Sequence, residues 1–166
     1  MPSVLFVCLG NICRSPMAEG ALRHQARRVG VDLTVDSAGT GGWHVGEPPD
    51  RRAQKVARRH GVEIGDLRAR QVTQEDFRLF DHVVALDHGN LAALEARRPV
   101  DATAMLTLLL DHVPGREGQA VADPYYGDLS AFEQTWAEVT AGAEGLLRLF
   151  GAESGPVGDE TRQRRP

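Results

Sequence analysis

The chain has only two cysteines among its 166 residues. Cys8 and Cys13 lie close together near its start, so they form no disulfide framework of the kind that stabilises secreted domains. A secretory signal is also lacking, because Met1–Ser3 has no basic residue and the apolar run Val4–Leu9 is too short for a signal core or a membrane span. We therefore expect a cytoplasmic protein in a reducing compartment, with no membrane association.

An excess of positive charge and the common metal-ligand patterns are absent too. The net charge is −4, so no basic field draws the chain to nucleic acid, and any anion site must be built locally. The six histidines show neither C-x-x-C nor H-E-x-x-H spacing, which argues against a metal centre.

The pattern of apolar residues predicts one domain in which strands and helices alternate. The length suits a single core, and 42% hydrophobic with 25% charged residues is typical of a folded chain. For the first half we expect, in order, a strand at Ser3–Val7, a helix at Pro16–Val29 capped by Ser15 and stopped by Gly30, a strand at 32–36, a loop at 37–49 and a helix ending at Gly61.

In the second half the pattern predicts a short helix at 74–80, a buried strand at 82–86, a helix at 90–97, an ambiguous strand at 104–108 and a closing amphipathic helix at 132–150, despite Gly142 and Gly145. From residue 151 onward the chain has almost nothing to bury. We therefore predict a folded domain at 1–150 and a flexible C-terminal tail at 151–166.

The segment Cys8–Ser15 carries the strongest chemical signal. It lies between a strand and the start of a helix, which is where open α/β sheets bind ligands. Backbone N–H groups of such a loop can hold a phosphate together with the positive end of the helix, and the same field favours the nucleophilic thiolate of Cys8. Arg14 offers a planar fork that matches phosphate oxygens and their transition-state charge.

Other residues of this loop fit the same interpretation. We expect Gly10 and Asn11 to supply positive φ angles, and Ser15 can donate to the Cys8 sulfur. A lone C-x5-R spacing more often means a buried structural cysteine beside a surface arginine. Here the strand, the glycine, the asparagine, the serine and the helix all fall in place, which favours function.

The run Val4–Glu19 resembles the opening of the low-molecular-weight protein tyrosine phosphatases. The resemblance continues through Asp36–Thr40, Ala69–Thr73 and Asp123–Asp128, in the order of that family, and covers about residues 3 to 150. It implies a twisted four-stranded parallel sheet with helices on both faces and a phosphate-binding loop after the first strand. It also implies hydrolysis of phosphotyrosine on proteins through a cysteinyl-phosphate intermediate, without a cofactor.

The resemblance further implies roles for individual residues. Cys8 is the nucleophile, Arg14 the phosphate clamp, and Asp123 the acid that protonates the leaving phenolate and then activates water. Ser37 is expected to hold the loop asparagine in place. Substrate contacts are expected from the remaining loop residues and from aromatic walls, namely Leu9, Gly10, Asn11, Ile12, Cys13, Ser15, Trp43, Tyr125 and Tyr126. Without the cysteine, residues 123–128 would be only a favourable turn. The alternative for Trp43, Tyr125 and Tyr126 is partial burial as ordinary hydrophobes.

One position departs from the pattern of the family. Where relatives usually carry a histidine bonded to the loop asparagine, the ungapped match places Leu67. Leucine cannot form that bond, which puts the rigidity of the Asn11 conformation in question but not the chemistry of the site.

Three alternatives remain to be weighed. An arsenate reductase needs further cysteines to resolve its intermediate, and none follows Cys13. A phosphoarginine phosphatase is nearer, but such relatives tend to carry threonine in place of Ile12 and to lack the tyrosine pair. A non-catalytic phosphate-binding module would not need Asp123. We therefore favour an enzyme that acts as a monomer on tyrosine-phosphorylated proteins.

Overall fold

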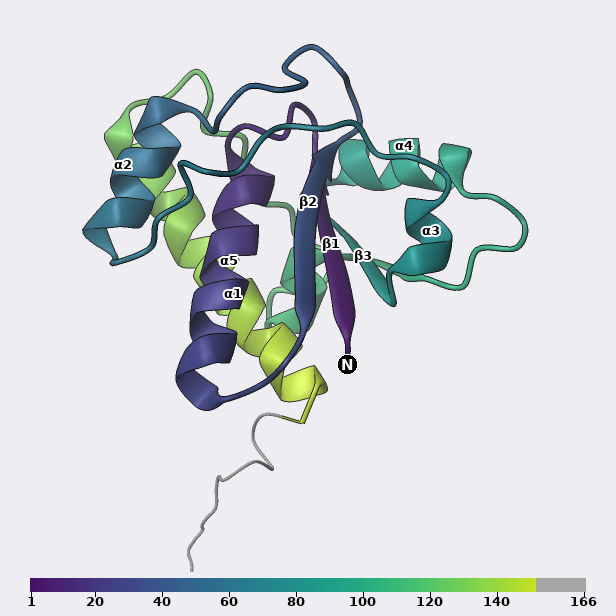
Figure 1. Cartoon of the computed structure of the whole chain (residues 1–166). Helices are drawn as coiled ribbons and strands as arrows, with labels where there is room; N and C mark the ends of the chain where they lie inside the picture. The colour runs from purple at the N-terminus through teal and green to yellow at the C-terminus, as the bar shows by residue number, and fades with distance from the viewer. Residues whose placement is uncertain (152–166) are drawn as a thin grey trace, which may run out of the picture.

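Four parallel strands form the sheet that the sequence predicts. The computed structural model describes residues 1–151, in which the strands lie in the order β2-β1-β3-β4 (Figure 1). Their bounds are Ser3–Cys8 for β1, Thr34–Gly39 for β2, His82–Ala85 for β3 and Met105–Leu108 for β4. The ambiguous fourth strand is thus confirmed. The predicted tail lies outside the described residues apart from Gly151.

The second strand begins and ends later than predicted. The glycines and prolines of residues 37–49 predict a loop that includes Ser37, Ala38 and Gly39, yet these three residues pair with the last three residues of β1. Small residues are accepted here because the sheet is covered on both faces, so that pairing with β1 outweighs local preference. This extension brings Gly39 opposite Cys8.

Helices cover both faces of the sheet. Figure 1 shows α1, α2 and α5 on one face and α3 and α4 on the other. The helices span Arg14–Val29 (α1), Arg51–Arg59 (α2), Asp76–Leu79 (α3), His88–Arg97 (α4) and Leu129–Leu149 (α5), with a 3-10 turn, η1, at Leu109–His112. The predicted three-layer α/β architecture is therefore confirmed.

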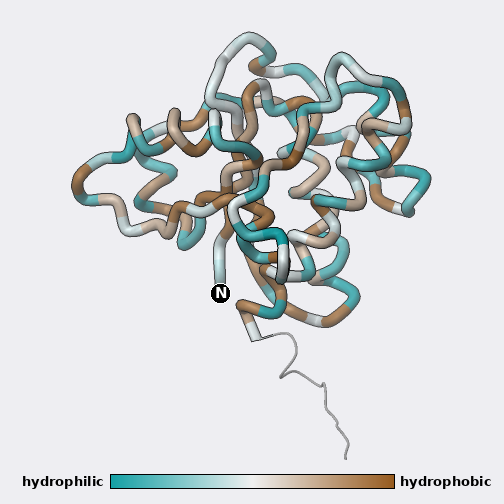
Figure 2. Tube along the Cα trace, turned by 180° about the vertical axis from the view of Figure 1, so that it is seen from behind, coloured by the Kyte–Doolittle hydropathy of each residue, from teal (hydrophilic) through white to brown (hydrophobic). Residues whose placement is uncertain are grey.

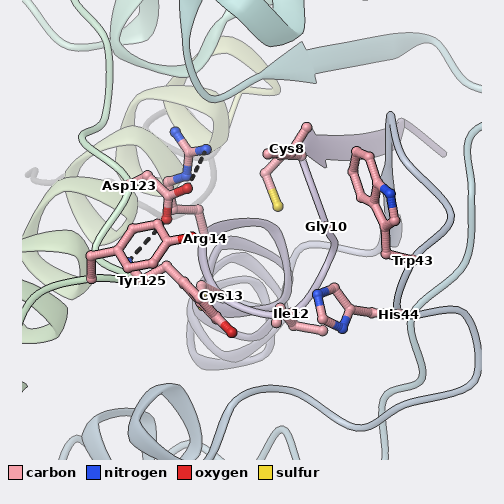
Figure 3. Close-up of a pocket in the computed structure, with 11 residues that line it drawn as sticks. Cys8, Gly10, Ile12, Cys13, Arg14, Trp43, His44, Asp123 and Tyr125 are labelled. Carbon is pink, nitrogen blue, oxygen red and sulfur yellow. Dashed lines mark hydrogen bonds and ion pairs between the residues drawn. The ribbon is translucent and has the colours of Figure 1, made fainter.

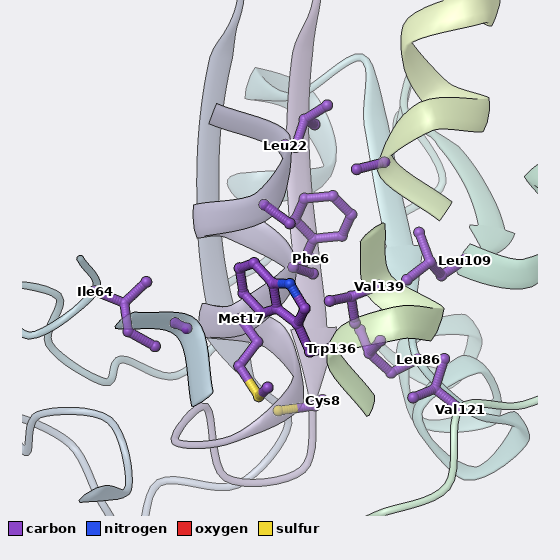
Figure 4. Close-up of a cluster of buried hydrophobic side chains, with 14 of the residues drawn as sticks. Phe6, Cys8, Met17, Leu22, Ile64, Leu86, Leu109, Val121, Trp136 and Val139 are labelled. Carbon is purple, nitrogen blue, oxygen red and sulfur yellow. The ribbon is translucent and has the colours of Figure 1, made fainter. Parts of the chain in front are cut away.

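The larger hydrophobic cluster lies between the sheet and helices α1, α2 and α5. Phe6 of β1 packs there with Met17 of α1 and Trp136 of α5, and Cys8 lies at the edge of the same cluster (Figure 4). Brown, hydrophobic stretches run through the centre of the molecule, while teal residues occupy much of the outer loops (Figure 2). The strand that ends at Cys8 is thus anchored in the core.

Two glycines of α5 serve close packing against η1. A Cβ on Gly142 would lie 2.5 Å from Leu109, and one on Gly145 would overlap the carbonyl oxygen of His112. Glycine normally weakens a helix interior. In α5 it lets the helix backbone approach η1, which explains why the helix runs on through both positions.

The start of α1 corrects one prediction. The helix begins at Arg14, its N-cap is Cys13, and no side chain caps it. Ser15 is therefore inside the helix and its hydroxyl is used elsewhere. Pro16 lies within the first turn, where its missing N–H costs nothing, and Gly30 adopts the left-handed conformation expected at the end.

No helix within residues 1–151 is long and apolar enough to cross a membrane.

Candidate active site

The loop between β1 and α1 presents Cys8 at the carboxyl edge of the sheet. β1 lies between β2 and β3, so the chain leaves it at the point where the strand order reverses, which is the usual ligand site of such sheets. The Cys8 Sγ lies 3.0 Å from the Ser15 Oγ, at the first turn of α1. The thiol of Cys8 therefore lies beside the N-terminus of α1.

Arg14 is almost fully buried and is held by groups from two other segments. Its Nη1 donates to Asp87 Oδ2 at 2.8 Å and to the carbonyl of Val121 at 2.8 Å. Burial alone would lower the pKa of Arg14, but the nearby Cys8 and Asp87 outweigh it and raise the pKa. Its charge is thus retained, and the guanidinium plane has one orientation.

Asn11 is the only residue other than glycine with a positive φ among the described residues, at 59°. Its Nδ2 donates to Ser15 Oγ at 2.8 Å and to Ser37 Oγ at 3.0 Å, and its Oδ1 accepts the Arg70 amide at 2.9 Å. Three segments therefore hold this conformation without the histidine that Leu67 replaces. Leu67 packs against the core instead.

A buried carboxylate continues this network. Ser37 donates to Glu19 Oε1 at 2.7 Å, and Glu19 Oε2 lies 2.6 Å from Arg23 Nη2. Burial raises the pKa of Glu19, opposed by its bonds to Ser37 and Arg23. Sequence reasoning missed this support, because nothing local connects Glu19 to the loop.

The loop forms the floor of an open cleft of about 240 Å³. In Figure 3, Trp43 and His44 lie on one side, and Tyr125 and Asp123 lie on the other. The predicted residues that line this cleft are Cys8, Leu9, Gly10, Ile12, Cys13, Arg14, Trp43, Asp123, Tyr125 and Tyr126. Asn11, Ser15 and Ser37, by contrast, are buried outside the cleft lining, where they support the loop.

The two walls are held differently. A Cβ on Gly41 would overlap the indole of Trp43, so that ring rests on the backbone of its own loop. The rings of Tyr125 and Tyr126 form a T-shaped, edge-to-face pair with centroids 5.0 Å apart. Trp43 and Tyr126 remain largely exposed, which leaves the mouth of the cleft open.

His44 is a cleft residue that the sequence analysis did not identify. Its Nδ1 lies 2.9 Å from Glu47 Oε1, and its ring packs over Gly10, where a Cβ would lie 3.1 Å from it. Gly10 does not have the positive φ that we predicted. Its lack of a side chain makes room for the imidazole instead.

Asp123 is half exposed and faces the clamp. Its Oδ2 lies 3.6 Å from Arg14 Nη2, and its Oδ1 accepts the backbone N–H of Tyr125 at 3.1 Å. An acid or base in this position can reach a group bound between the cysteine and the arginine. No group of three His, Cys, Asp or Glu side chains within the described part of the chain could hold a metal ion.

Known proteins match this chain over nearly its whole length. The family model described as low molecular weight phosphotyrosine protein phosphatase matches residues 3–155. A low molecular weight protein-tyrosine-phosphatase of Streptomyces coelicolor is 46% identical over 149 residues, which are 87% of this chain and 90% of that protein. The low molecular weight protein-tyrosine-phosphatase YfkJ of Bacillus subtilis is 42% identical over 149 residues, 89% and 94% of the two chains.

Solved structures agree. The crystal structure of YfkJ superimposes with a TM-score of 0.85 and 41% identity, covering 92% of this chain and 96% of YfkJ. A Drosophila arginine phosphatase superimposes with a TM-score of 0.83 and 34% identity, covering 89% of this chain and 96% of that protein. The sequence match, the sheet order and the loop that follows β1 agree, and the chain belongs to the low molecular weight phosphotyrosine protein phosphatase family.

Proposed function

We propose that the protein hydrolyses phosphotyrosine on proteins, with Cys8 as nucleophile, Arg14 as phosphate clamp and Asp123 as general acid and base. The observation that carries this assignment is that Cys8 and Arg14 of the loop after β1 line one cleft with Asp123, which lies more than a hundred residues further along the chain. A phosphate-binding module without catalysis would need the loop and Arg14 but no carboxyl group beside them.

The first step transfers the phosphoryl group to Cys8. The thiolate attacks phosphorus, an S–P bond forms, and the P–O bond to the tyrosine oxygen breaks. Asp123 gives its proton to the departing phenolate, and the Arg14 fork binds the equatorial oxygens, where negative charge spreads in the transition state. The backbone N–H groups of the loop and the start of α1 bind the same oxygens.

The second step restores the enzyme. A water molecule attacks the phosphorus of the cysteinyl phosphate, the Asp123 carboxylate takes a proton from it, and the S–P bond breaks. Inorganic phosphate leaves and Cys8 is again a thiolate. Ser15, with its hydroxyl 3.0 Å from Sγ, can donate a hydrogen bond to this leaving thiolate.

The walls of the cleft favour an aryl substrate. Tyr125 and Trp43 flank the loop from opposite sides and can pack against the tyrosine ring. Because the mouth is open, the ring can enter while it remains attached to a folded protein. We propose tyrosine-phosphorylated proteins as substrates. A catalytic unit at 1–150, a monomeric state and a cytoplasmic location stay predictions from the sequence.

The likeness to a Drosophila arginine phosphatase makes phosphoarginine a second candidate. The fold is the same for both activities, so the cleft must decide between them. Ile12 and the exposed ring of Tyr126 give an apolar cleft with aromatic walls, which suits a phenyl group better than a guanidinium. Parallel assays with phosphotyrosine and phosphoarginine peptides of one sequence distinguish the two activities.

The central test is hydrolysis of p-nitrophenyl phosphate without added metal, by wild type and by Cys8→Ser. We expect turnover by the wild type, none by the variant, and phosphate binding by both, because the loop and Arg14 are unchanged. Residual activity above about a hundredth of wild type would remove Cys8 as nucleophile. Phosphate binding without any wild-type turnover would favour the binding module.

A further inference from the structure

Arg52 joins parts of the active site that are far apart in the chain. Its Nε and Nη2 donate to the two carboxylate oxygens of Asp50 at 3.0 and 2.9 Å, and its Nη1 donates to the carbonyl of Gly127 at 3.1 Å. The Asp50 amide in turn donates to the carbonyl of Ile12 at 2.8 Å. The start of α2 is thus bonded to both the phosphate-binding loop and the turn that follows Asp123.

The same guanidinium lies over two aromatic rings. Its Cζ is 4.5 Å from the ring centre of Phe132 and 5.6 Å from that of Tyr125. Phe132 is fully buried in α5, whereas Tyr125 lines the cleft. A cation that lies over two ring faces attracts both, so the buried core supports the cleft wall through Arg52.

The turn that Arg52 holds also orients Asp123. Asp123 Oδ1 accepts the backbone N–H of Tyr125, and the Gly127 amide donates to the carbonyl of Pro124 at 2.8 Å. A displacement of Gly127 or of the Tyr125 ring therefore moves the carboxyl group. Since general acid catalysis requires hydrogen-bond reach of the leaving oxygen, a small displacement is enough to impair it.

We propose that Arg52 is a positioning residue that holds Asp123 and Tyr125 in place for protonation of the leaving group. This inference rests on the proposed role of Asp123 as general acid. Arg52 is suited to the task because its planar fork binds a carboxylate, a carbonyl and two ring faces at once. The ammonium group of a lysine cannot do this.

The test compares leaving groups in Arg52→Gln. Phenyl phosphate needs protonation of its leaving oxygen, whereas p-nitrophenyl phosphate needs little, and kcat/KM reports the step in which that bond breaks. We expect kcat/KM to fall by about tenfold or more for phenyl phosphate and by less than about threefold for p-nitrophenyl phosphate. Arg51→Gln is the matched control, because the side chain of that neighbouring arginine is exposed and has no partner among residues 1–151; we expect it to leave both values unchanged.

A second arm separates positioning from a general loss of structure. In an Asp123→Asn background, Arg52→Gln should lower kcat/KM for phenyl phosphate by less than about twofold, because the acid that it positions is already absent. Arg52→Lys keeps the charge and the aliphatic stem, so it tests the same leaving-group defect at a melting temperature near that of wild type, even if Arg52→Gln does not fold.

Two results would overturn the inference: equal losses for both substrates, or a loss that multiplies fully with that of Asp123→Asn. If wild type and Arg51→Gln are active and the Arg52 variants are equally active on both substrates, this inference is rejected and the proposed function stands. Wild type that hydrolyses neither substrate would instead reject the proposed function.

Discussion

The carboxylate of Asp87 binds the guanidinium of Arg14 with one oxygen and caps α4 with the other. Asp87 Oδ2 lies 2.8 Å from Arg14 Nη1, and Asp87 Oδ1 accepts a hydrogen bond from the backbone N–H of Asn90 at 2.7 Å. The residue after β3 therefore both starts a helix and orients the phosphate clamp. The two roles can be separated, because asparagine caps helices about as well as aspartate.

Asp87→Asn should accordingly weaken catalysis more than folding. We expect kcat/KM for p-nitrophenyl phosphate to fall by about tenfold, about 1.4 kcal/mol of transition-state stabilisation, because Arg14 loses its charged anchor. The melting temperature should change by less than about 4 °C. Steady-state kinetics and thermal unfolding check both values. A large melting shift with unchanged kinetics would mean that Asp87 only caps α4.

Asp123→Asn should slow the enzyme according to the leaving group. We expect a large loss of kcat/KM, about 10²-fold or more, for phenyl phosphate and a much smaller one for p-nitrophenyl phosphate, since an activated leaving group needs little protonation. The measurement is kcat/KM across a series of substituted aryl phosphates. Equal losses along the series would assign Asp123 to another role.

Asn11 combines a costly backbone conformation with bonds to three segments, and two substitutions distinguish these contributions. Asn11→Gly removes the bonds but accepts the positive φ, while Asn11→Ala also adds about 1–2 kcal/mol of strain. We expect the melting temperature of Asn11→Ala to lie at least about 2 °C below that of Asn11→Gly. Similar values would mean that the loop relaxes to another conformation.

Leu67 provides the companion test of loop rigidity. Leu67→Ala should cost packing energy yet leave kcat/KM within about twofold of wild type, because Leu67 has no bond to Asn11. If this variant loses as much activity as Asn11→Gly, Leu67 does contribute to the loop conformation.

Two partly buried histidines predict a loss of stability in mild acid. Burial lowers the pKa of His82 and of His112, partly opposed by Asp81 and Asp111 respectively, and each is lowered from an ordinary 6.5. Below about pH 6.5 the unfolded chain therefore binds more protons than the folded one, so the free energy of unfolding falls as the pH decreases. His82 Nδ1 is buried without a partner among residues 1–151 and its ring contacts Phe150, so we expect its protonation also to disturb the end of α5.

Urea unfolding at about pH 7.5 and about pH 5.5 measures this effect. We expect a smaller difference between the two midpoints in the double variant His82→Asn, His112→Gln than in the wild type. His88→Gln, which changes an exposed histidine, serves as the control. An unchanged difference in the double variant would show that other groups govern acid sensitivity.

Peroxide should inactivate the enzyme reversibly through a bond between Cys8 and Cys13. Burial, with the nearby Asp50 and Cys8, raises the pKa of Cys13, so that its thiol stays protonated and Cys8 is attacked first. The Cys8 thiolate attacks peroxide, whose O–O bond breaks; Cys8 becomes a sulfenic acid and the hydroxide that leaves takes a proton from solvent to form water. The Cys13 thiol then condenses with the sulfenic acid, forming the S–S bond and releasing a second water.

The measurements are activity after dithiothreitol and intact mass. Wild type should recover most of its activity and show the loss of two hydrogens before reduction. Cys13→Ser should recover little, because its sulfenic acid has no resolving thiol and is oxidised further. Equal recovery in both proteins would exclude a protective role for Cys13.

The sequence predicted those features whose causes lie close together in the chain. The strand, the loop and the helix around Cys8 are encoded within a few residues, so the anion site could be placed without a structure. Asp123 required the resemblance to the family, since its turn alone has no catalytic signature. The second strand was misplaced because pairing with β1, rather than local preference, decides where it ends.

Apart from Ser15 and Ser37, the supporting residues could not be predicted, because each acts through a tertiary contact. Asp87, Arg52 and Glu19 meet the site only after folding, at residues that no spacing rule connects. For Ser15 the sequence predicts both a helix cap and a bond to the Cys8 sulfur; the structure has the contact with Cys8 and a further bond from Asn11, but no cap. Its neighbours in space, rather than in sequence, decide its use.

The contact between Trp43 and Gly41 makes position 41 a site at which substrate specificity can be redesigned. A methyl group at Gly41 would occupy the space of the indole, and the exposed ring can swing away at little cost. Replacement of one residue that touches no reacting atom should therefore reshape one wall of the cleft while Cys8 and Arg14 stay in place. Libraries built at position 41 can thus sample new specificities without rebuilding the catalytic groups.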